Sequence, residues 1–354
     1  MKLPRILVLY NEPVLPADHP DAHSEHDVVE TADDAYDVLR AAGFEVAKLG
    51  INYDPRPLLD YLQKNRPGAV FNLFEGLATQ TGTEVGAAAL LEWLNVPFTG
   101  CPSACLSLGR DKVRTKHLLS AAGIPTPEYM LVESLPVPEW GGEWPAIVKP
   151  VYQDASVGID QKSVVTSQEE LEERARHLFA RFGAPVLVER FVFGREFHVN
   201  LIEERFAPQG SPPRVLPVTE VVFQGAKPGR WPVYTYTAKW DEHSDEYATA
   251  DIRTAVALTP DELARLEPIA WSAFRTLQCR DFARLDVRLD PQGRFHVLEV
   301  NPNPYLNSIT LVDGLKAIGK SHEWWLVEMA LAALARGGVE VPPADLLVPA
   351  GAKA

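Results

Sequence analysis

The strongest constraint on the fold lies in residues 281–301, DFARLDVRLDPQGRFHVLEVN. Two runs in which apolar and polar residues alternate flank the turn sequence Asp-Pro-Gln-Gly at 290–293. Short alternating runs around a Pro-Gly turn are typical of a β-hairpin, because successive side chains of a strand point to opposite faces. The stretch therefore predicts two antiparallel strands, each with an apolar and a polar side.

Four polar residues can share one face of this hairpin, because strand side chains repeat every two residues: Arg284 and Asp286 in the first strand, Glu299 and Asn301 in the second. If the first and last residues of the turn pair with each other, all four lie on the same face, and slippage by one residue would separate them. Two carboxylates and an amide oxygen beside a guanidinium can hold Mg²⁺, which takes oxygen ligands together with nucleotide phosphates. The alternative is a hairpin with exposed, salt-bridged acids.

The bulk composition indicates an ordinary globular protein. A chain of 354 residues, 46% hydrophobic and 23% charged, can form two or three domains with proper cores. The formal net charge of −14 argues against a nucleic-acid-binding surface as the main function. An anionic substrate would then need local cations, so individual lysines at the ends of secondary-structure elements become informative.

Neither a signal peptide nor a membrane span is expected. The apolar run near the N-terminus is short and lacks a small-residue cleavage site, and the longest apolar run, 324–335, is too short to cross a bilayer and contains Glu328. The three cysteines, Cys101, Cys105 and Cys279, form neither an even disulfide set nor a metal-binding spacing, so we expect buried or partly buried free thiols. The expected location is cytoplasmic.

Strands and helices alternate up to about residue 107, which predicts a parallel α/β layer. The expected strands are 5–10, 44–51, 69–75 and 96–100, and the expected helices are 28–39, 58–65 and 84–95. Segment 11–26 is rich in Pro, Asp and His and is expected to be a loop.

The rest of the chain predicts two further α+β units. The first has a helix from Asp111 to Gly123, strands at 128–132, 145–150, 163–167 and 184–191, and a helix at 169–182. The second has longer strands at 195–204 and 214–223, a helix at 260–278, the hairpin, helices within 313–336 and a weakly structured tail at 337–354. The polar and aromatic segment 225–249, which follows the strand expected at 214–223, is long enough to suggest a functional loop.

Three further sets of residues could serve a nucleotide. Lys112 at a helix start and Lys149 at a strand end can reach phosphates as point charges. The loop 151–159, with Ser156, Val157 and Gly158, could cover a phosphate with its backbone N–H groups, although it is not a Walker A sequence. The strand segment 188–199 carries Glu189 and Glu196, whose carboxylates suit an adenine amino group and ribose hydroxyls. Each set alone is also compatible with surface lysines, a plain turn or solvated glutamates.

The chain contains, in this order, the segments DKVRTKHLLSAAGIPTP, AIVKP, SVG, VERFVFGREFHV, RLDV and HVLEVNPNP. These segments resemble the successive motifs of the ATP-grasp superfamily, and of its D-alanine–D-alanine ligase branch in particular. The resemblance extends from about residue 69 to 335, and the last motif is the most specific. It implies an ATP-grasp fold behind an N-terminal Rossmann-like parallel α/β domain. The expected divisions are a substrate domain at 1–107, a small ATP-grasp subdomain at 108–188, and a large subdomain at 189–354 with the metal site and C-terminal helices.

The resemblance also implies a role for each site residue. ATP phosphates would contact Lys112, Lys149, Ser156 and Val157, and the adenosine would contact Glu189, the backbone near Phe191 and Val192, and Glu196. Two Mg²⁺ ions, with Mn²⁺ as an alternative, would be held by Asp286, Glu299 and Asn301. The catalytic residues would be Arg284, which stabilises a tetrahedral oxyanion, Ser156 and Lys239, whose neighbour Trp240 would contact the substrate in a mobile loop.

The implied reaction converts a carboxylate into an acyl phosphate, which an amine then attacks. Charge that builds on the phosphoryl group and on the tetrahedral oxygen is stabilised by metal ions and preorganised cations. The chain departs from the family pattern around the amino-acid substrates. Tyr305 stands where the family has a glycine, so a bulky ring should fill or reshape the acceptor pocket, and Glu25, Asp27 and Glu30 are equal candidates for the anchor of a substrate amine.

The prediction is therefore an ADP-forming carboxylate–amine ligase for small-molecule substrates, with no nucleic-acid or membrane partner and with a homodimer left open. D-alanine is the default substrate by resemblance. The nearest alternative is the same chemistry on other amino acids or on a secondary-metabolite carboxylate. Two further alternatives are a non-catalytic nucleotide-binding module and a phosphotransferase that releases its phosphorylated product.

Overall fold

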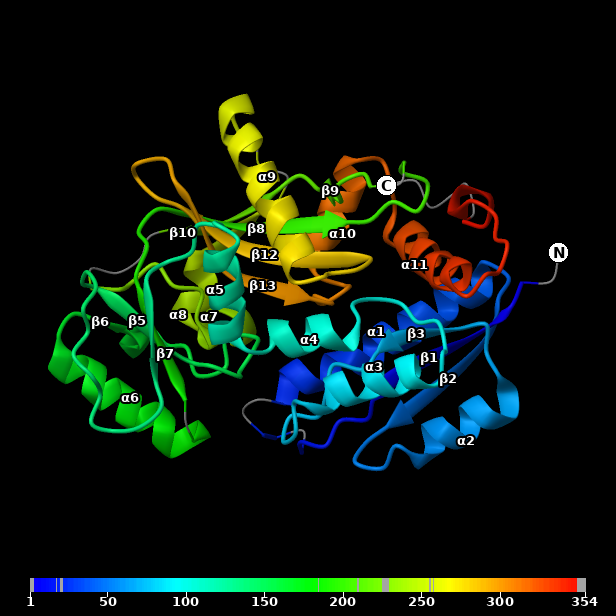
Figure 1. Ribbon diagram of the computed structural model, residues 1–354, viewed down its shortest axis with the longest axis horizontal. Coiled ribbons are helices and arrows are strands. Elements are labelled where there is room, and N and C mark those ends of the chain that lie inside the picture. The colour runs from blue at the N-terminus through cyan, green and yellow to red at the C-terminus, as the bar shows by residue number, and fades with distance from the viewer. Residues whose placement is uncertain are drawn as a thin grey trace.

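Three β-sheets organise the chain in a computed structural model that describes residues 3–16, 18–19, 22–183, 185–208, 210–224, 229–254, 256 and 258–348. A three-stranded sheet, a four-stranded sheet and a six-stranded sheet follow one another along the sequence. In Figure 1 the four-stranded sheet lies at one end of the molecule, the three-stranded sheet at the other, and the six-stranded sheet between them. Among the described helices, none combines the length and apolar character needed to cross a membrane.

The first sheet is parallel, as the alternation of strands and helices predicted. Its order is β2-β1-β3, formed by β1 (Arg5–Asn11), β2 (Glu45–Ile51) and β3 (Ala69–Leu73). The connecting helices are α1 (Ala22–Ala41), α2 (Arg56–Asn65) and α3 (Thr83–Trp93). The strand expected at 96–100 is wrong: only one parallel bridge, between Val70 and Phe98, extends the sheet there, because the chain turns away at Gly100.

Helix α1 begins earlier than the sequence suggested. Segment 11–26 was expected to be a loop throughout, yet α1 already includes residues 22–26, and positions 17, 20 and 21 lie outside the described residues. The carboxylate of Glu25, in the first turn of α1, accepts hydrogen bonds from the backbone N–H groups of Val14 and Leu15 at 3.0 and 2.8 Å. This tertiary contact, rather than local propensity, determines where the helix starts.

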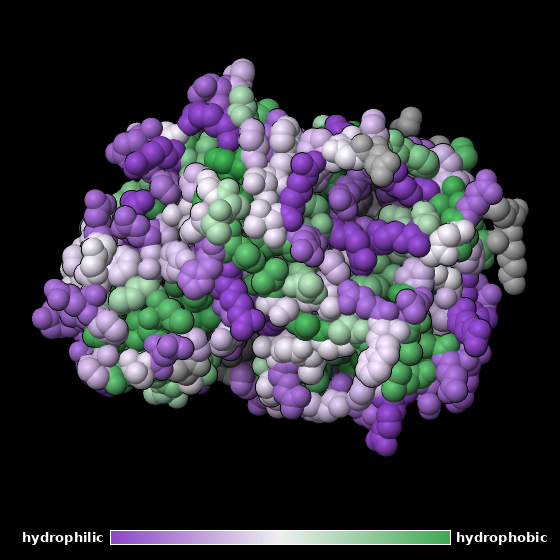
Figure 2. Space-filling model, viewed as in Figure 1, coloured by the Kyte–Doolittle hydropathy of each residue, from purple (hydrophilic) through white to green (hydrophobic). Residues whose placement is uncertain are grey.

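The four-stranded sheet forms the small unit. Its antiparallel order is β4-β7-β5-β6, with β4 (Tyr129–Val132), β5 (Ala146–Pro150), β6 (Val164–Val165) and β7 (Val186–Arg190). Helix α6 (Gln168–Phe182) is capped by Ser167 and packs its Leu171, Ala175 and Leu178 onto this sheet. In Figure 2, hydrophobic side chains gather on the surface of this part of the molecule, whereas hydrophilic ones cover most of the periphery.

Two helices join the first sheet to the small unit. They are α4 (Ser103–Gly109), which the sequence did not predict, and α5 (Lys112–Ala121). Asp111 caps α5, because its carboxylate accepts hydrogen bonds from the backbone N–H groups of Val113 and Arg114 at 3.1 and 3.0 Å. The cap places Lys112 at the first position of the helix, as expected.

The six-stranded sheet has the order β11-β10-β8-β12-β13, with β9 paired to β8. Its strands are β8 (Arg195–Ile202), β9 (Arg214–Val215), β10 (Thr219–Phe223), β11 (Ala250–Arg253), β12 (Phe282–Leu289) and β13 (Phe295–Pro302). The single strand expected at 214–223 is wrong, since residues 216–218 interrupt it. The segment expected as a long loop at 225–249 contains two short helices, α7 (Tyr236–Trp240) and α8 (Asp245–Thr249), while 225–228 lie outside the described residues.

Helix α9 (Pro260–Thr276) covers one face of this sheet. Its residues Leu266, Ala270 and Phe274 belong to the same apolar cluster as Phe197 of β8 and Leu285 of β12. Because side chains alternate along a strand, the residues next to Phe197 and Leu285 point to the opposite face. That opposite face lines the cleft described below.

The β12–β13 hairpin places the four polar residues on one face, as predicted, but its strands pair in a different register from the one expected. The first residue of the turn, Asp290, pairs with Arg294 rather than with Gly293, because its N–H donates to the Arg294 carbonyl at 2.9 Å. This register alone would place Val300 opposite Arg284. A β-bulge between Asp286 and Val287 shifts the pairing by one more residue, so that Asp286 pairs with Glu299 and Arg284 with Asn301.

The two C-terminal helices return to the first sheet. They are α10 (Ile309–Ala317) and α11 (His322–Arg336), and α10 begins four residues before the helices expected within 313–336. In α11, Trp325 and Leu331 are buried in the same cluster as Ile6 and Phe71 of the first sheet. The expected tail includes a short 3-10 helix, Ala344–Leu346, and Val341 and Val348 pack on that cluster, while 349–354 lie outside the described residues. The three divisions predicted from the sequence stay a prediction.

We expect Gly194→Ala to lower the free energy of unfolding by about 3 kcal/mol. Gly194 connects β7 to β8 with φ +130°, and an added Cβ would lie 2.0 Å from the Leu289 carbonyl oxygen, at the end of β12. Gly86→Ala is a matched control, because Gly86 is exposed within α3 with open space around it and alanine favours helix by up to about 1 kcal/mol. Chemical denaturation measures both, and equal stabilities of the two variants would contradict the steric argument.

Candidate active site

A cleft lies between the small sheet and the large sheet. Strands β5 and β7 supply one wall, β8, β12 and β13 supply the other, and the segments 153–159 and 233–239 lie at its side. All the site residues predicted from the sequence line this cleft except Tyr305 and Trp240.

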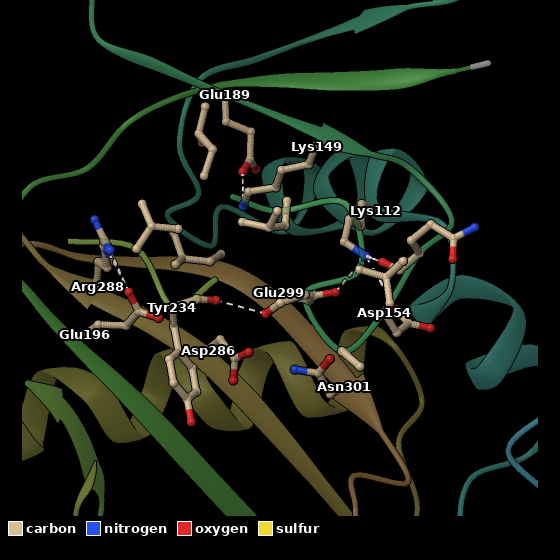
Figure 3. A pocket seen from close by; sticks show the side chains of 18 of the residues that line it. Lys112, Lys149, Asp154, Glu189, Glu196, Tyr234, Asp286, Arg288, Glu299 and Asn301 are labelled. Atoms are coloured by element: carbon tan, nitrogen blue, oxygen red, sulfur yellow. Dashed lines mark hydrogen bonds and ion pairs between the residues drawn. The ribbon is translucent and has the colours of Figure 1, made fainter. Parts of the chain in front are cut away.

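The predicted metal ligands point into one end of the cleft. Figure 3 shows Asp286, Glu299 and Asn301 on the same side of the β12–β13 hairpin. Arg284 donates two hydrogen bonds to Asp286, at 2.7 and 3.1 Å. Burial opposes the charge of Asp286, but the Arg284 guanidinium outweighs it and holds the pKa of that carboxyl well below its usual range. Two carboxylates and an amide oxygen form a donor set that fits Mg²⁺ or Mn²⁺.

Lys112 joins this hairpin to the loop 153–159. Its ammonium lies 2.9 Å from the Glu299 carboxylate, donates to the Gln153 carbonyl at 2.5 Å, and lies 3.4 Å from Asp154 (Figure 3). Burial disfavours the charged form, yet Glu299 and Asp154 raise the pKa of Lys112 above its ordinary value. A cation that stays charged beside a predicted metal ligand is suited to a phosphate oxygen.

An ionic network continues from the cleft into the first sheet's unit. Arg110 lies 3.6 Å from Asp154 and 2.7 Å from Glu84, which belongs to α3. Burial raises the pKa of Glu84 to about 8, and the Arg110 charge opposes that rise. The loop 153–159 is thus linked to the β12–β13 hairpin through Lys112 and to the unit of the first sheet through Arg110 and Glu84.

A buried ion triad lies at the opposite end of the cleft. Glu189 on β7 is 1% exposed and contacts the ammonium groups of both Lys116 and Lys149, the second at 2.5 Å (Figure 3). Lys116 also donates to Thr126 at 2.7 Å. Burial opposes ionisation of Glu189, but the two lysines outweigh it and lower the pKa of the carboxyl to about 2. The predicted adenine contact and one predicted phosphate contact are therefore paired with each other in the structure.

Arg288 organises the region predicted to bind the sugar. Its guanidinium donates to Glu196 at 3.0 and 2.6 Å and to the carbonyl oxygens of Val192 and Pro232 at 2.5 Å each. The same group lies over the Phe191 ring at 4.7 Å from its centre. The backbone N–H of Phe191 donates to the Pro145 carbonyl at 2.9 Å. The segment between β7 and β8 is therefore held by Pro145 on one side and by Arg288 on the other.

The loop 153–159 contacts the segment that carries Lys239 and Trp240. Ser156 donates to the Tyr234 carbonyl at 2.9 Å, and the Trp240 indole donates to the Ala155 carbonyl at 3.3 Å. Ala155 and Ser156 have φ values of 52° and 63°, in the left-handed region that L residues seldom adopt. These contacts close the cleft on this side, and they explain why Trp240 packs on the loop instead of lining the cavity.

Three groups surround Arg284 in the middle of the cleft. Burial and the nearby Arg284 charge lower the pKa of Lys239, whose ammonium lies 5.1 Å from the centre of the Tyr234 ring. Burial raises the pKa of Tyr234 to about 12. Burial also lowers the pKa of His198 to about 4, so its imidazole is neutral at pH 7, with Nε2 at 3.9 Å from Asp286.

Tyr305 lies outside this cleft, near α1. Burial raises the pKa of its hydroxyl, and the charges of Asp27, Glu75 and Glu30 add to the rise. Glu25, by contrast, uses its carboxylate on backbone N–H groups, including that of Ala78 at 3.1 Å as well as those of the 14–15 loop. Of the three acids that the sequence left equal, Glu25 is therefore engaged with the backbone, and the charges of Asp27 and Glu30 act on Tyr305.

Among the residues in or beside the cleft that sequence reasoning missed are Lys116, Asp154, His198, Tyr234 and Arg288, whose contacts are described above. Three of them carried a usable signal. His198 follows Glu196 by two residues and Arg288 follows Asp286 by two, as expected for one face of a strand, and Lys116 follows Lys112 by one helical turn. Asp154 and Tyr234 lie in irregular segments, where periodicity gives no information.

Comparisons with known proteins agree with this geometry. The family profile described as "D-ala D-ala ligase C-terminus" matches residues 118–322. A D-alanine–D-alanine ligase of Pseudoalteromonas translucida is 32% identical over 295 residues, which cover 79% of this chain and 86% of that protein. A ligase of the same name from Aquifex aeolicus is 32% identical over 279 residues, covering 77% and 84%.

Solved structures show the same fold. The D-alanine–D-alanine ligase of Bacillus anthracis, in complex with ATP, has a TM-score of 0.71 at 16% identity and covers 95% of this chain and 99% of its own. The VanG D-Ala:D-Ser ligase of Enterococcus faecalis has a TM-score of 0.67 at 18% identity and covers 94% and 99%. Both likenesses extend over nearly the whole chain, so they include the first sheet as well as the two that flank the cleft.

We expect Glu189→Gln to remove part of the acid dependence of stability. The folded-state pKa of Glu189 lies at about 2, below the ordinary value of 4.5, so its ionisation stabilises the fold above pH 4.5 and that contribution is lost as the pH falls towards 2. The contribution is on the order of 3 kcal/mol. Denaturant unfolding between pH 2 and 7 should give a lower but flatter stability profile for the variant.

Exposed Glu139 provides the control, since Glu139→Gln should keep the profile of the unmodified protein. A Glu189→Gln profile that falls as steeply as the unmodified one below pH 4.5 would contradict the assigned ion triad.

Proposed function

Because this chain belongs to the D-alanine–D-alanine ligase family, whose fold is the ATP-grasp fold, we propose that it joins the carboxylate of one amino acid to the amine of another. As a member of that family it is an ATP-dependent, ADP-forming ligase that makes an amide bond. The structure that supports the proposal is the face of the β12–β13 hairpin, where Asp286, Glu299 and Asn301 point into the cleft between the two sheets.

The proposed reaction has two steps. The substrate carboxylate takes the γ-phosphoryl group of ATP, which turns an oxide leaving group into phosphate, and the amine of the second substrate then displaces that phosphate from the acyl carbon. Divalent metal held by Asp286, Glu299 and Asn301 would neutralise charge on the transferring phosphoryl group. Lys112, which stays charged next to Glu299, is placed to contact the same phosphate.

Arg284 is the proposed stabiliser of the tetrahedral oxyanion. Its guanidinium is fixed by two hydrogen bonds to Asp286, so it needs little reorganisation when negative charge develops nearby. Burial and the Arg284 charge lower the pKa of Lys239, and an incoming anionic substrate would favour its charged form. Ser156 and Val157 lie on the loop proposed to cover the phosphates.

Adenosine would lie at the other end of the cleft, with Glu189, Phe191 and Val192 around the base and Glu196 at the ribose. Glu196 is held by Arg288, so we assign Arg288 the task of orienting the ribose contact. Nucleotide binding would also bring the phosphates to Lys149, which is paired with Glu189 in the structure. The cost of separating that pair would be offset by the new contact of Lys149 with phosphate.

For the substrates, D-alanine follows from the names of the relatives, and a second candidate is a different amino acid at the amine-accepting position. The observation that favours the second candidate is Tyr305, a half-buried ring close to Asp27 and Glu30. A ring at this position narrows the space next to the hairpin, and the two acids could anchor an amino group. A homodimeric assembly and a cytoplasmic location stay predictions, as does the role of residues 1–107 in binding the substrates.

Asp286→Asn and Glu299→Gln should each abolish ATP turnover while the protein stays folded. Either change removes a carboxylate from the metal site without changing its shape, and loss of such a ligand should reduce amine-dependent ADP release by at least about 1000-fold. Circular dichroism checks the fold. Asp251→Asn, on exposed β11 of the same sheet, should turn over normally. Near-normal turnover of either site variant at saturating Mg²⁺ would refute the assigned metal role.

Tyr305→Gly should widen or shift the range of accepted amino acids, and Tyr305→Phe, which keeps the ring, should not. The measurement is ADP release with panels of D- and L-amino acids as carboxylate and amine. An unchanged profile for Tyr305→Gly would remove Tyr305 from the substrate pocket. ADP release with a carboxylate alone would indicate a phosphotransferase, and no ADP release from the unmodified protein under any condition would indicate a nucleotide-binding module.

A further inference from the structure

The three cysteines of the chain converge at one point outside the cleft. Cys101 lies two residues before α4, Cys105 lies in α4, and Cys279 lies in the connection between α9 and β12. Although up to 178 positions separate them in sequence, their sulfur atoms all lie within 4.8 Å of one another, and the sulfurs of Cys105 and Cys279 are 3.6 Å apart. All three are free and buried.

We propose that these three thiols form a binding site for a soft, three-coordinate cation, copper(I) being the biological candidate. A metal at about 2.3 Å from each of three sulfurs requires sulfur–sulfur separations of about 4 Å. One observed separation is 3.6 Å and all three are below 4.8 Å, so small side-chain rotations would complete the site. The site does not rest on the ligase reaction, because none of the three cysteines lines the cleft.

The donor set selects the class of cation. Thiolates prefer soft metals such as copper(I) and zinc. Structural zinc sites use four protein ligands, whereas among the described residues no fourth His, Cys, Asp or Glu side chain joins this cluster. A cation that is stable with three sulfur ligands therefore fits better than zinc.

In the free protein Cys101 has two carbonyl oxygens as hydrogen-bond acceptors, those of Arg280 at 3.4 Å and Phe282 at 3.6 Å. Cation binding would displace thiol protons.

The backbone around the cluster is held on both sides, which preorganises the three sulfurs. The N–H of Cys101 donates to the Asn303 side chain at 2.7 Å, and the N–H of Arg280 donates to the Cys101 sulfur at 3.4 Å. Asp281 accepts from the Gly100 N–H at 2.7 Å. Cys279 keeps 8% exposure, whereas Cys101 and Cys105 have none, so the cation would enter past Cys279.

The test is an anaerobic titration of the reduced, full-length protein with copper(I) in competition with bicinchoninate. The expected result is one copper(I) per chain, with three sulfur neighbours in the X-ray absorption spectrum. Cys105→Ala and Cys279→Ala should each weaken binding by at least about 100-fold, since only two thiols remain. Ser103→Ala, which changes a residue between Cys101 and Cys105 that offers no sulfur, should bind like the unmodified protein.

Circular dichroism and amine-dependent ADP release show whether each variant is folded. If the cysteine variants do not fold, the X-ray absorption spectrum of the copper-loaded unmodified protein is the test. Two sulfur neighbours, or nitrogen and oxygen ligands, around the copper would then overturn the proposal. It would also be overturned by the absence of bound copper(I), by equal binding in Cys279→Ala, or by zinc binding tightly with four ligands. Copper(I) binding requires neither ATP nor amino acids, so the titration of the unmodified protein tests this site independently of the ligase activity.

Discussion

The pairing of β12 with β13 is the constraint on which the candidate active site depends. The two strands carry the proposed metal ligands and Arg284, and a strand places a side chain on one face or the other with no intermediate choice. The turn at 290–294 pairs the strands one residue away from the register that would align these ligands, and the bulge opposite Asp286 corrects the alignment by one residue. Two irregularities of the hairpin, each unfavourable for the site alone, therefore compensate each other.

The cleft is lined by charges that neutralise one another in pairs. The pairs are Lys112 with Glu299, Lys149 with Glu189, Arg284 with Asp286, and Arg288 with Glu196. Each places a cation next to a carboxylate, and the pairing keeps the charged forms stable in a partly desolvated cavity. Binding of a nucleotide and divalent metal would exchange several of these pairs for phosphate–cation and metal–carboxylate contacts. The cleft is thus preorganised for charged ligands, which would replace partners already present.

Much of the fold and of the cleft could be predicted from periodicity. The parallel first sheet followed from alternating apolar strands and helices, and helix α9 lies within the helix expected at 260–278. The residues that the family resemblance predicted to bind the nucleotide all line the cleft. The start of α1 was not predicted, and there Glu25 binds the backbone of the 14–15 loop. The strand expected at 96–100 is reduced to one bridge, because the chain turns away at Gly100.

The sequence by itself determined which faces of the strands are apolar, where most helices lie, and which motif carries the acidic oxygens, because side-chain periodicity and capping are local properties. Only the tertiary structure decided the bulged register, the use of Glu25 as a clamp on backbone N–H groups, and the convergence of Cys101, Cys105 and Cys279. Each of these requires residues distant in sequence to come within a few ångströms of one another. No spacing along the chain encodes that distance, since it depends on how whole sheets and helices pack.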